Sequence, residues 1–309
     1  MLRLAGPLSG LVGLLLLLVG AAPAAAQEGT PAGDGDAEAE FAPLAFALLD
    51  EAPAAPAFFA LGRITIEPGA ANPPIALGGP LVGVIEAGTL AAQPNGPVSV
   101  QRAAAAATPG PAEIATPYIE FELGPGDQIV TPAGTGVAYY NIGDEPASAL
   151  IVALLPADEP LPTAVPAGVT TEFLASGVMT ELPAAPLALA MARLTYAPGQ
   201  ADPAPSENPG PLLAHVESGT FGYTVASGES QVTRAGVDGT PVAAPAATPA
   251  ALGEEVTLAA GDALFEQGGT TSSGRNPGEE PAVVLVAVVG PAEEFAEEEG
   301  SPAAGTPAP

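Results

Sequence analysis

The sequence predicts an all-β protein built from two tandem domains. The first observation is an internal repeat that covers most of the chain. The second is a series of short β-rich segments bounded by proline and glycine, without long stretches of helical periodicity. The 309 residues are enough for two domains that each bury a core. Together these features favour a sandwich or barrel of antiparallel strands in each repeat.

The repeat is visible as matched segments at a slowly growing spacing. Glu51–Pro56 matches Glu181–Pro186 at an offset of 130 residues, and Asn141 matches Asn276 at 135. Small insertions in loops explain the growth of the offset, as expected for a duplicated domain. Further matches are Arg63–Gly69 with Arg193–Gly199, Glu86–Thr89 with Glu217–Thr220, Arg102 with Arg234, and Gly126 with Gly261.

Each repeat is expected to contain six strands. In the first they are Leu61–Glu67, Leu81–Glu86, Val98–Arg102, Tyr118–Leu123, Gly136–Ile142 and Ala149–Leu155. In the second they are Ala190–Tyr196, Leu212–Glu217, Phe221–Val225, Gln231–Arg234, Glu255–Leu258 and Ala282–Val289. The alanine- and proline-rich pieces 103–117 and 239–252 are expected to be surface loops, because proline cannot donate to a strand ladder.

The N-terminus has the pattern of a signal peptide. Arg3 precedes an apolar run at Leu11–Gly20, and Ala24–Ala26 provides an A-x-A cleavage site. We expect cleavage after Ala26 and a secreted, extracellular or cell-envelope protein. An uncleaved anchor is the alternative, and it requires the alanines after Gly20 to be counted into the span.

These observations divide the chain into six parts. The expected parts are a signal peptide at 1–26, a disordered linker at 27–40, a first domain at 41–156, a linker at 157–170, a second domain at 171–291, and a disordered acidic, proline-rich tail at 292–309.

Charge and composition exclude several classes of function. The chain has 35 acidic and 6 basic residues, a formal net charge of −29. A nucleic-acid partner requires a cationic face, and an anionic membrane surface would repel this chain. The chain has no cysteine, so disulfides and thiol chemistry are absent.

Two spaced motifs in the first repeat resemble those of the cupin superfamily. The motifs are Gly69-x5-Ile75-x-Leu77-x3-Leu81-x6-Gly88 and Gly126-x5-Pro132-x-Gly134-x2-Val137-x3-Asn141. The chain looks like a two-domain cupin, or bicupin, and the resemblance implies two tandem jelly-roll β-barrels.

The four positions that hold metal ligands in the family carry other residues here. They read Ile75, Leu77, Leu81 and Val137 in the first repeat and Pro205, Glu207, Leu212 and Ser272 in the second. Aliphatic side chains have no donor atoms for a transition metal. We therefore expect no metal, no other cofactor and no catalytic residue inherited from the family.

Four polar residues of the second repeat are the candidates for ligand binding: Glu207, Ser272, Arg275 and His215. Strand alternation places His215 beside Glu217 on the outer face of the sheet, if Leu212 points inward. His215 is then a structural or surface residue rather than a cavity residue. Arg275 has no counterpart in the first repeat and is the best candidate for asymmetric binding.

The other arginines occur as repeat pairs, Arg63 with Arg193 and Arg102 with Arg234. Ion pairs with Glu86 and Glu217 or with Asp127 and Asp262 are the structural interpretation. Capture of an anion by the guanidinium fork is the functional one.

The leading hypothesis is a secreted, non-catalytic bicupin that binds a small molecule, a saccharide or a protein partner. The alternative is a metal-independent enzyme, isomerase- or epimerase-like, that uses acid–base groups of the second barrel. A structural envelope protein is a third hypothesis. The sequence leaves the identity of the ligand and the oligomeric state open.

Overall fold

The computed structural model describes residues 39–103, 112–159, 165–236 and 247–295. Within these ranges every element is a β-strand except for one short 3-10 helix, η1 (Ala292–Phe295). The all-β prediction is confirmed. The expected signal peptide, nearly all of the linker at 27–40, and residues 296–309 of the expected tail lie outside the described residues.

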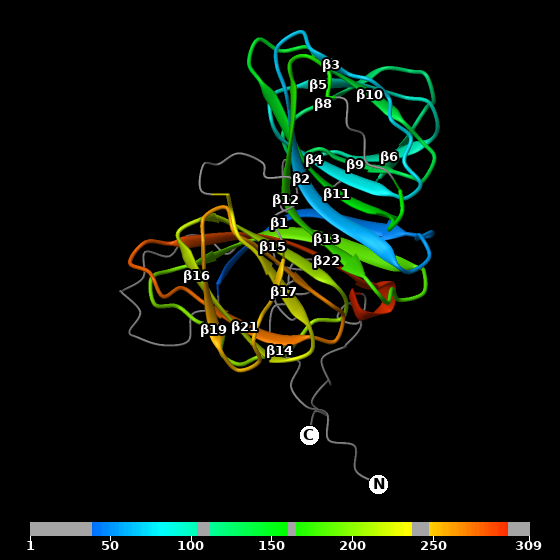
Figure 1. Cartoon of the computed structure of the whole chain (residues 1–309). Helices are drawn as coiled ribbons and strands as arrows, with labels where there is room; N and C mark the ends of the chain where they lie inside the picture. Colours follow the sequence, from blue (N-terminus) through cyan, green and yellow to red (C-terminus); the bar gives the residue numbers. More distant parts are fainter. Residues whose placement is uncertain (1–38, 104–111, 160–164, 237–246, 296–309) are drawn as a thin grey trace, which may run out of the picture.

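The first domain consists of two antiparallel sheets, at the top of Figure 1. The larger sheet has the order β12-β2-β11-β4-β9-β6-β7, and the smaller has the order β3-β10-β5-β8. The strands are β2 (Ala57–Ile66), β3 (Ala71–Asn72), β4 (Leu81–Ala87), β5 (Leu90–Pro94), β6 (Val98–Gln101), β7 (Glu113–Ala115), β8 (Phe121–Leu123), β9 (Gln128–Thr131), β10 (Val137–Asn141), β11 (Ala147–Pro156) and β12 (Val169–Met179).

The second domain repeats this arrangement, with the orders β1-β13-β22-β15-β20-β17-β18 and β14-β21-β16-β19. Its strands are β1 (Glu40–Leu49), β13 (Leu187–Tyr196), β14 (Ser206–Glu207), β15 (Leu212–Ser218), β16 (Thr220–Ser227), β17 (Ser230–Thr233), β18 (Thr248–Pro249), β19 (Glu255–Ala259), β20 (Ala263–Glu266), β21 (Thr271–Arg275) and β22 (Ala282–Pro291). The two sheets of a domain are not hydrogen-bonded into a closed barrel. Each domain thus has one seven-stranded and one four-stranded antiparallel sheet, the two-sheet arrangement of a jelly roll.

Several strands lie outside the expected set, among them β1, β5, β9, β12, β20 and β21. β7 and β18 fall within the pieces expected to be loops, and η1 begins the segment expected to be a disordered tail. Phe295 of η1 contacts the ring of Phe46, with centroids 6.2 Å apart. This aromatic contact orders the first turn of the C-terminal segment.

The first motif ends at a glycine that the backbone requires. Gly88 and its repeat partner Gly219 both have φ of +76°, a region that residues with a Cβ rarely adopt. A Cβ at Gly88 would lie 2.7 Å from Ala147, and one at Gly219 would lie 2.4 Å from the Pro281 carbonyl oxygen. The tight turns therefore explain why the scaffold glycines persist in both repeats.

The two domains exchange their first strands. β1 precedes the first domain in the chain but pairs with β13 of the second, and β12 pairs with β2 of the first. Both strands carry a bulge at the same point of the repeat, between Pro43 and Ala45 and between Phe173 and Ala175. The expected domain ranges, 41–156 and 171–291, did not anticipate this exchange.

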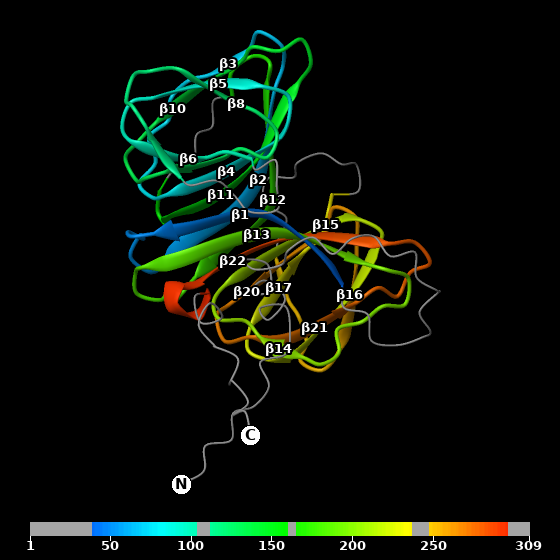
Figure 2. The same ribbon diagram turned by 180° about the vertical axis from the view of Figure 1, so that it is seen from behind.

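The larger sheets of the two domains pack against each other and share one core. In Figure 2, β1 and β13 lie directly beneath β2, β11 and β12. The core contains Phe59 and Leu61 of β2 together with Leu213 of β15 and Phe265 of β20, all almost fully buried. The interface is therefore continuous hydrophobic core, as in obligate assemblies.

Glutamine side chains cover the free edges of the exchanged strands. Gln128 accepts a hydrogen bond from the Phe46 amide at 2.9 Å and donates one to the Phe46 carbonyl at 2.8 Å. Gln267 donates to the Val178 carbonyl at 2.9 Å. Such contacts occupy backbone groups that an open sheet edge would offer to another chain.

The shared core predicts the effect of a truncation at the interface. Leu213→Ala should lower the free energy of unfolding by roughly 2–5 kcal/mol, because Leu213 is fully buried between the sheets. Leu48→Ala is the control, since Leu48 is exposed on β1. Guanidinium unfolding followed by circular dichroism measures both, and equal stability of the two variants would contradict the shared core.

Candidate functional site

The side chain of Glu266 points into the interior of the second domain, because side chains alternate along a strand. In β20, Ala263 and Phe265 point into the core shared by the two domains, whereas Leu264 points into the core of the second domain alone. Because side chains alternate along a strand, Glu266 follows Leu264 to the inner face. The strand thus places a carboxyl group between the two sheets of the second domain.

Glu266 lines a cavity of about 40 Å³ between those sheets. The polar side chains that line it include Tyr196, Asp202, Asn208, Tyr223, Glu266 and Ser272. No lysine, arginine or histidine is among its lining residues. The volume corresponds to a few water molecules.

The Glu266 carboxyl is held by two side chains. Ser272 Oγ donates to Glu266 Oε1 at 2.9 Å, and Asn208 Nδ2 donates to Oε2. The carboxyl is 2% exposed and has no ion-pair partner, since none of the ion pairs found among the described residues includes it. Burial raises the pKa of Glu266 to about 7, although the hydrogen bonds from its neighbours lower it in part.

Tyr223 brings a hydroxyl group to the same cavity. Its ring comes from β16 in the opposite sheet, and the residue is 3% exposed. Among the described residues, its hydroxyl and that of Ser230 are the buried side-chain groups without a hydrogen-bond partner of normal geometry. Burial, followed by the nearby charge of Glu266, raises the pKa of Tyr223, so the phenol stays protonated. The Tyr223 hydroxyl interacts with Glu266 and lowers the pKa of that carboxyl in part, so the two polar groups face the same space.

Asp202 is the second carboxyl group of the cavity. Its side chain accepts a hydrogen bond from the Tyr196 hydroxyl at 3.0 Å and another from the Gly274 amide. Burial raises the pKa of Asp202, and these hydrogen bonds limit the rise. Both of its oxygens are therefore partly occupied by protein donors.

The first domain fills the corresponding space with apolar side chains. Thr131 lies in β9 at the position of Glu266, and Val137 lies at the position of Ser272. Val137 belongs to a core with Leu90 and Ala92. Val137 is therefore part of the hydrophobic core of the first domain.

The two domains also differ in which of two paired strands carries the tyrosine. In the first domain Tyr139 of β10 pairs with Ala92 of β5. In the second domain the partners are Gly274 of β21 and Tyr223 of β16. A Cβ on Gly274 would lie 2.4 Å from the Phe221 ring, so this glycine makes room for aromatic side chains on β16.

Of the four predicted ligand-binding residues, only Ser272 lines the cavity. Glu207 is exposed on β14 and pairs with Thr271. The backbone contact from Gly134 to Leu77 recurs from Gly269 to Asn208, so Asn208 replaces Leu77. Between Gly199 and Leu212 the second repeat has one residue more than the first, and the structure places this insertion before Asn208 rather than after it. The residue that faces inward is therefore Asn208, and Glu207 points outward.

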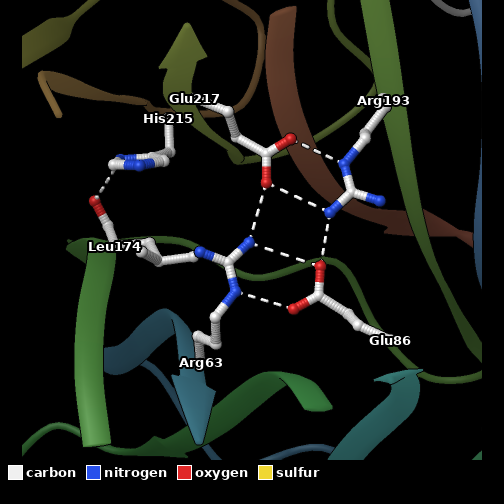
Figure 3. Close-up of polar contacts among 6 residues, drawn as sticks. All are labelled: Arg63, Glu86, Leu174, Arg193, His215 and Glu217. Atoms are coloured by element: carbon white, nitrogen blue, oxygen red, sulfur yellow. Dashed lines mark hydrogen bonds and ion pairs between the residues drawn. The ribbon is translucent and has the colours of Figure 1, made fainter. Parts of the chain in front are cut away.

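His215 points away from the cavity, as alternation predicted. Its Nδ1 lies 3.1 Å from the Leu174 carbonyl oxygen of β12, at the junction between the domains (Figure 3). The side chain is buried there rather than at the surface. Burial lowers the pKa of His215, although Glu172 and Glu217 oppose the shift. His215 thus has a structural position.

Arg275 is exposed and forms an ion pair with Glu255 on the outer face of the smaller sheet. It is not among the residues that line the cavity. Arg275 therefore lies outside the cavity that Ser272 lines, although only two residues lie between them in the chain.

The paired arginines Arg63 and Arg193 form a four-charge cluster between the domains, shown in Figure 3. Arg63 Nε lies 2.6 Å from Glu86, and Arg193 Nε lies 2.6 Å from Glu217. Each guanidinium also contacts the carboxylate of the other domain, with Arg63 Nη2 at 2.8 Å from Glu217. The predicted ion pairs are confirmed, and they cross the domain boundary.

The second arginine pair has a role within each domain. Arg102 bonds Asp127 at 2.8 Å, and Arg234 bonds Asp262 at 2.7 Å. Each guanidinium also donates to a backbone carbonyl, of Glu122 or Thr257. These contacts fix the turns before β9 and β20, and the ion-pair interpretation holds for this pair as well.

The comparisons with known proteins concern the fold. No family model and no curated protein matches the chain. Among solved structures, AerE from Microcystis aeruginosa has 12% identity and a TM-score of 0.39, covering 80% of this chain and 98% of its own. A cupin 2 conserved barrel domain protein from Leptotrichia buccalis has 12% identity and a TM-score of 0.36, covering 83% and 92%.

A Lactobacillus farciminis oxalate decarboxylase–formate complex also has 12% identity and a TM-score of 0.36, covering 83% of this chain and 87% of its own. The sheet order establishes the jelly roll independently of these weak likenesses. Similarity at this level assigns no activity to the chain.

Sequence reasoning missed Glu266, Asn208, Tyr223 and Asp202. A signal for Glu266 was present in the segment Ala263–Glu266, where an apolar strand ends in a carboxylate. The register of Leu264 toward the domain interior would have placed that carboxylate inward. Among the described residues no three His, Cys, Asp or Glu side chains gather as metal ligands.

The raised pKa of Glu266 predicts a pH-dependent effect of Glu266→Gln. The folded protein holds this proton more tightly than the unfolded chain, so its contribution to stability is complete below about pH 4.5 and is lost as the pH rises through about 7. At pH 8 the variant should be more stable than the parent by up to about 3 kcal/mol, with the gain disappearing at pH 4. Unfolding at both pH values, with Glu207→Gln as an exposed control, measures this; no pH dependence of the difference would contradict it.

The cluster between the domains predicts non-additive substitutions. Glu86→Gln should cost about 1–3 kcal/mol, because Arg63 and Arg193 then share one carboxylate. Adding Glu217→Gln should cost more than the sum of the single changes, since both guanidinium groups lose every carboxylate partner. Urea unfolding measures the cycle, with exposed Glu255→Gln as the control expected to leave stability unchanged. Strict additivity would argue against a shared cluster.

Proposed function

We propose that the chain is an exported, non-catalytic binding module whose second domain takes a small polar ligand beside Glu266. The observation that carries the proposal is the buried Glu266 carboxyl, which lines a polar cavity together with Tyr223 and has no cationic residue in that lining. The first domain serves as its structural partner, because its larger sheet covers the outer face of β15 and β20. Export is supported by the signal-like residues 1–26, which lie outside the described residues.

The cavity limits the size of the ligand. An engineered cavity that admits benzene has a volume of about 150 Å³. The cavity around Glu266 has about 40 Å³, and a hexose ring is larger than benzene. A saccharide or a protein partner would therefore need a different surface of the molecule, and we propose a ligand of only a few heavy atoms.

A panel of small solutes tests the binding function. Formamide, acetamide, formate, methanol and methylammonium are compared by thermal unfolding, because a ligand that binds only the folded state raises the midpoint. We expect at least one to act saturably on the parent and on the exposed control Ala226→Val. Ala214→Val, which fills the cavity lining, should abolish the effect. No saturable response, or one that persists in Ala214→Val, would reject the proposal.

A metal-independent enzyme is the second candidate, and the pKa of Glu266 favours it. A carboxyl with a pKa of about 7 beside a protonated phenol suits general acid–base catalysis near neutral pH. Glu207 and His215, the acid–base groups among the four residues predicted to bind a ligand, lie outside the cavity. Deuterium exchange into small carbonyl compounds, followed by NMR, tests this candidate. Exchange that disappears in Glu266→Gln would show catalysis and reject the non-catalytic function.

Within the described residues no helix is long and apolar enough to cross a membrane.

A further inference from the structure

The polar groups of the cavity in the second domain have an unequal balance of donors and acceptors. The donor hydrogens of Ser272 and Asn208 already point to Glu266, and Asp202 receives those of Tyr196 and Gly274. The Tyr223 hydroxyl is a further donor, and its hydrogen bond to Glu266 lowers the pKa of that carboxyl. The capacity that remains consists mainly of oxygen lone pairs. A ligand that supplies several N–H donors would satisfy these lone pairs, whereas a small carboxylate would add further acceptors.

The charge of the cavity also favours a ligand that supplies N–H donors. The titratable groups that line it are Glu266, Asp202, Tyr196 and Tyr223, and none of them becomes cationic. Ionised Glu266 has no counter-charge there, and a buried charge requires a partner or is neutralised. A cation can supply that partner, and the net charge of −29 favours its approach.

Aromatic rings complete the environment. Tyr196 and Phe221 contact each other in the lining, with centroids 5.3 Å apart, and Tyr223 lies with them on the inner face. The faces of aromatic rings attract ammonium groups. The volume of about 40 Å³ excludes a bulky quaternary amine and leaves room for a nitrogen with one or no methyl group.

We propose that this cavity binds a small protonated amine, ammonium or methylammonium, with Glu266 as its counter-charge and Tyr223 as a second oxygen ligand. The inference rests on the proposed binding function and names its ligand class. Because the amine and a proton compete for the same carboxylate, binding is about tenfold weaker at pH 6 than at pH 8.

Calorimetric titration with methylammonium chloride at pH 8, in sodium HEPES at constant ionic strength, tests the proposal. Saturable binding to the parent and to Glu207→Gln is expected, with at least a tenfold loss in Glu266→Gln and in Tyr223→Phe. Both cavity variants retain the shape of the side chain, and thermal unfolding confirms that they fold. Tetramethylammonium and potassium chloride should not bind at the same concentrations.

The outcomes separate the ligand class from the binding function. Equal binding of potassium, or equal binding to the parent and Glu266→Gln, would overturn the amine assignment. If formamide or formate acts through the cavity and methylammonium does not, the amine assignment fails while the binding function stands. If no solute of either kind acts through the cavity, both fail.

Discussion

The packing of the two larger sheets against each other is the constraint on which the rest of the structure depends. Phe59 of the first domain and Phe265 of the second are buried in one core, and the exchanged strands β1 and β12 extend the sheets across the boundary. Gly177 of β12 lies so close to the Phe265 ring that an added Cβ would lie 2.2 Å from it. The two domains are therefore expected to fold as one cooperative unit rather than as independent modules.

This interface also determines the chemistry of the interior. A strand has two faces, and the residues of β20 that enter the shared core leave Leu264 and Glu266 for the inside of the second domain. The four-charge cluster of Arg63, Glu86, Arg193 and Glu217 lies between the domains. No cationic residue lines the cavity of the second domain, so Glu266 has no counter-charge there.

Much of the architecture could be predicted from the sequence. The repeat at a nearly constant offset predicted two similar domains, and the turn glycines defined the spacing of the motifs. Strand alternation predicted that His215 points away from the cavity. The exchange of β1 and β12 could not be predicted, because pairing partners far apart in the chain leave no periodic signal. The position of Glu207 was wrong because a one-residue insertion can be placed on either side of it, and a shift of one residue reverses the face of a strand.

The fold buries the Glu266 carboxyl inside the second domain without a counter-charge. Carbon-13 NMR titration of the glutamate carboxyl carbons, assigned with Glu266→Gln, measures this directly. The structure predicts that the Glu266 resonance titrates with a midpoint near pH 7, because its carboxyl is buried without a counter-charge. A midpoint near pH 4 would show that Glu266 is in water, and it would contradict both the strand register and the cavity.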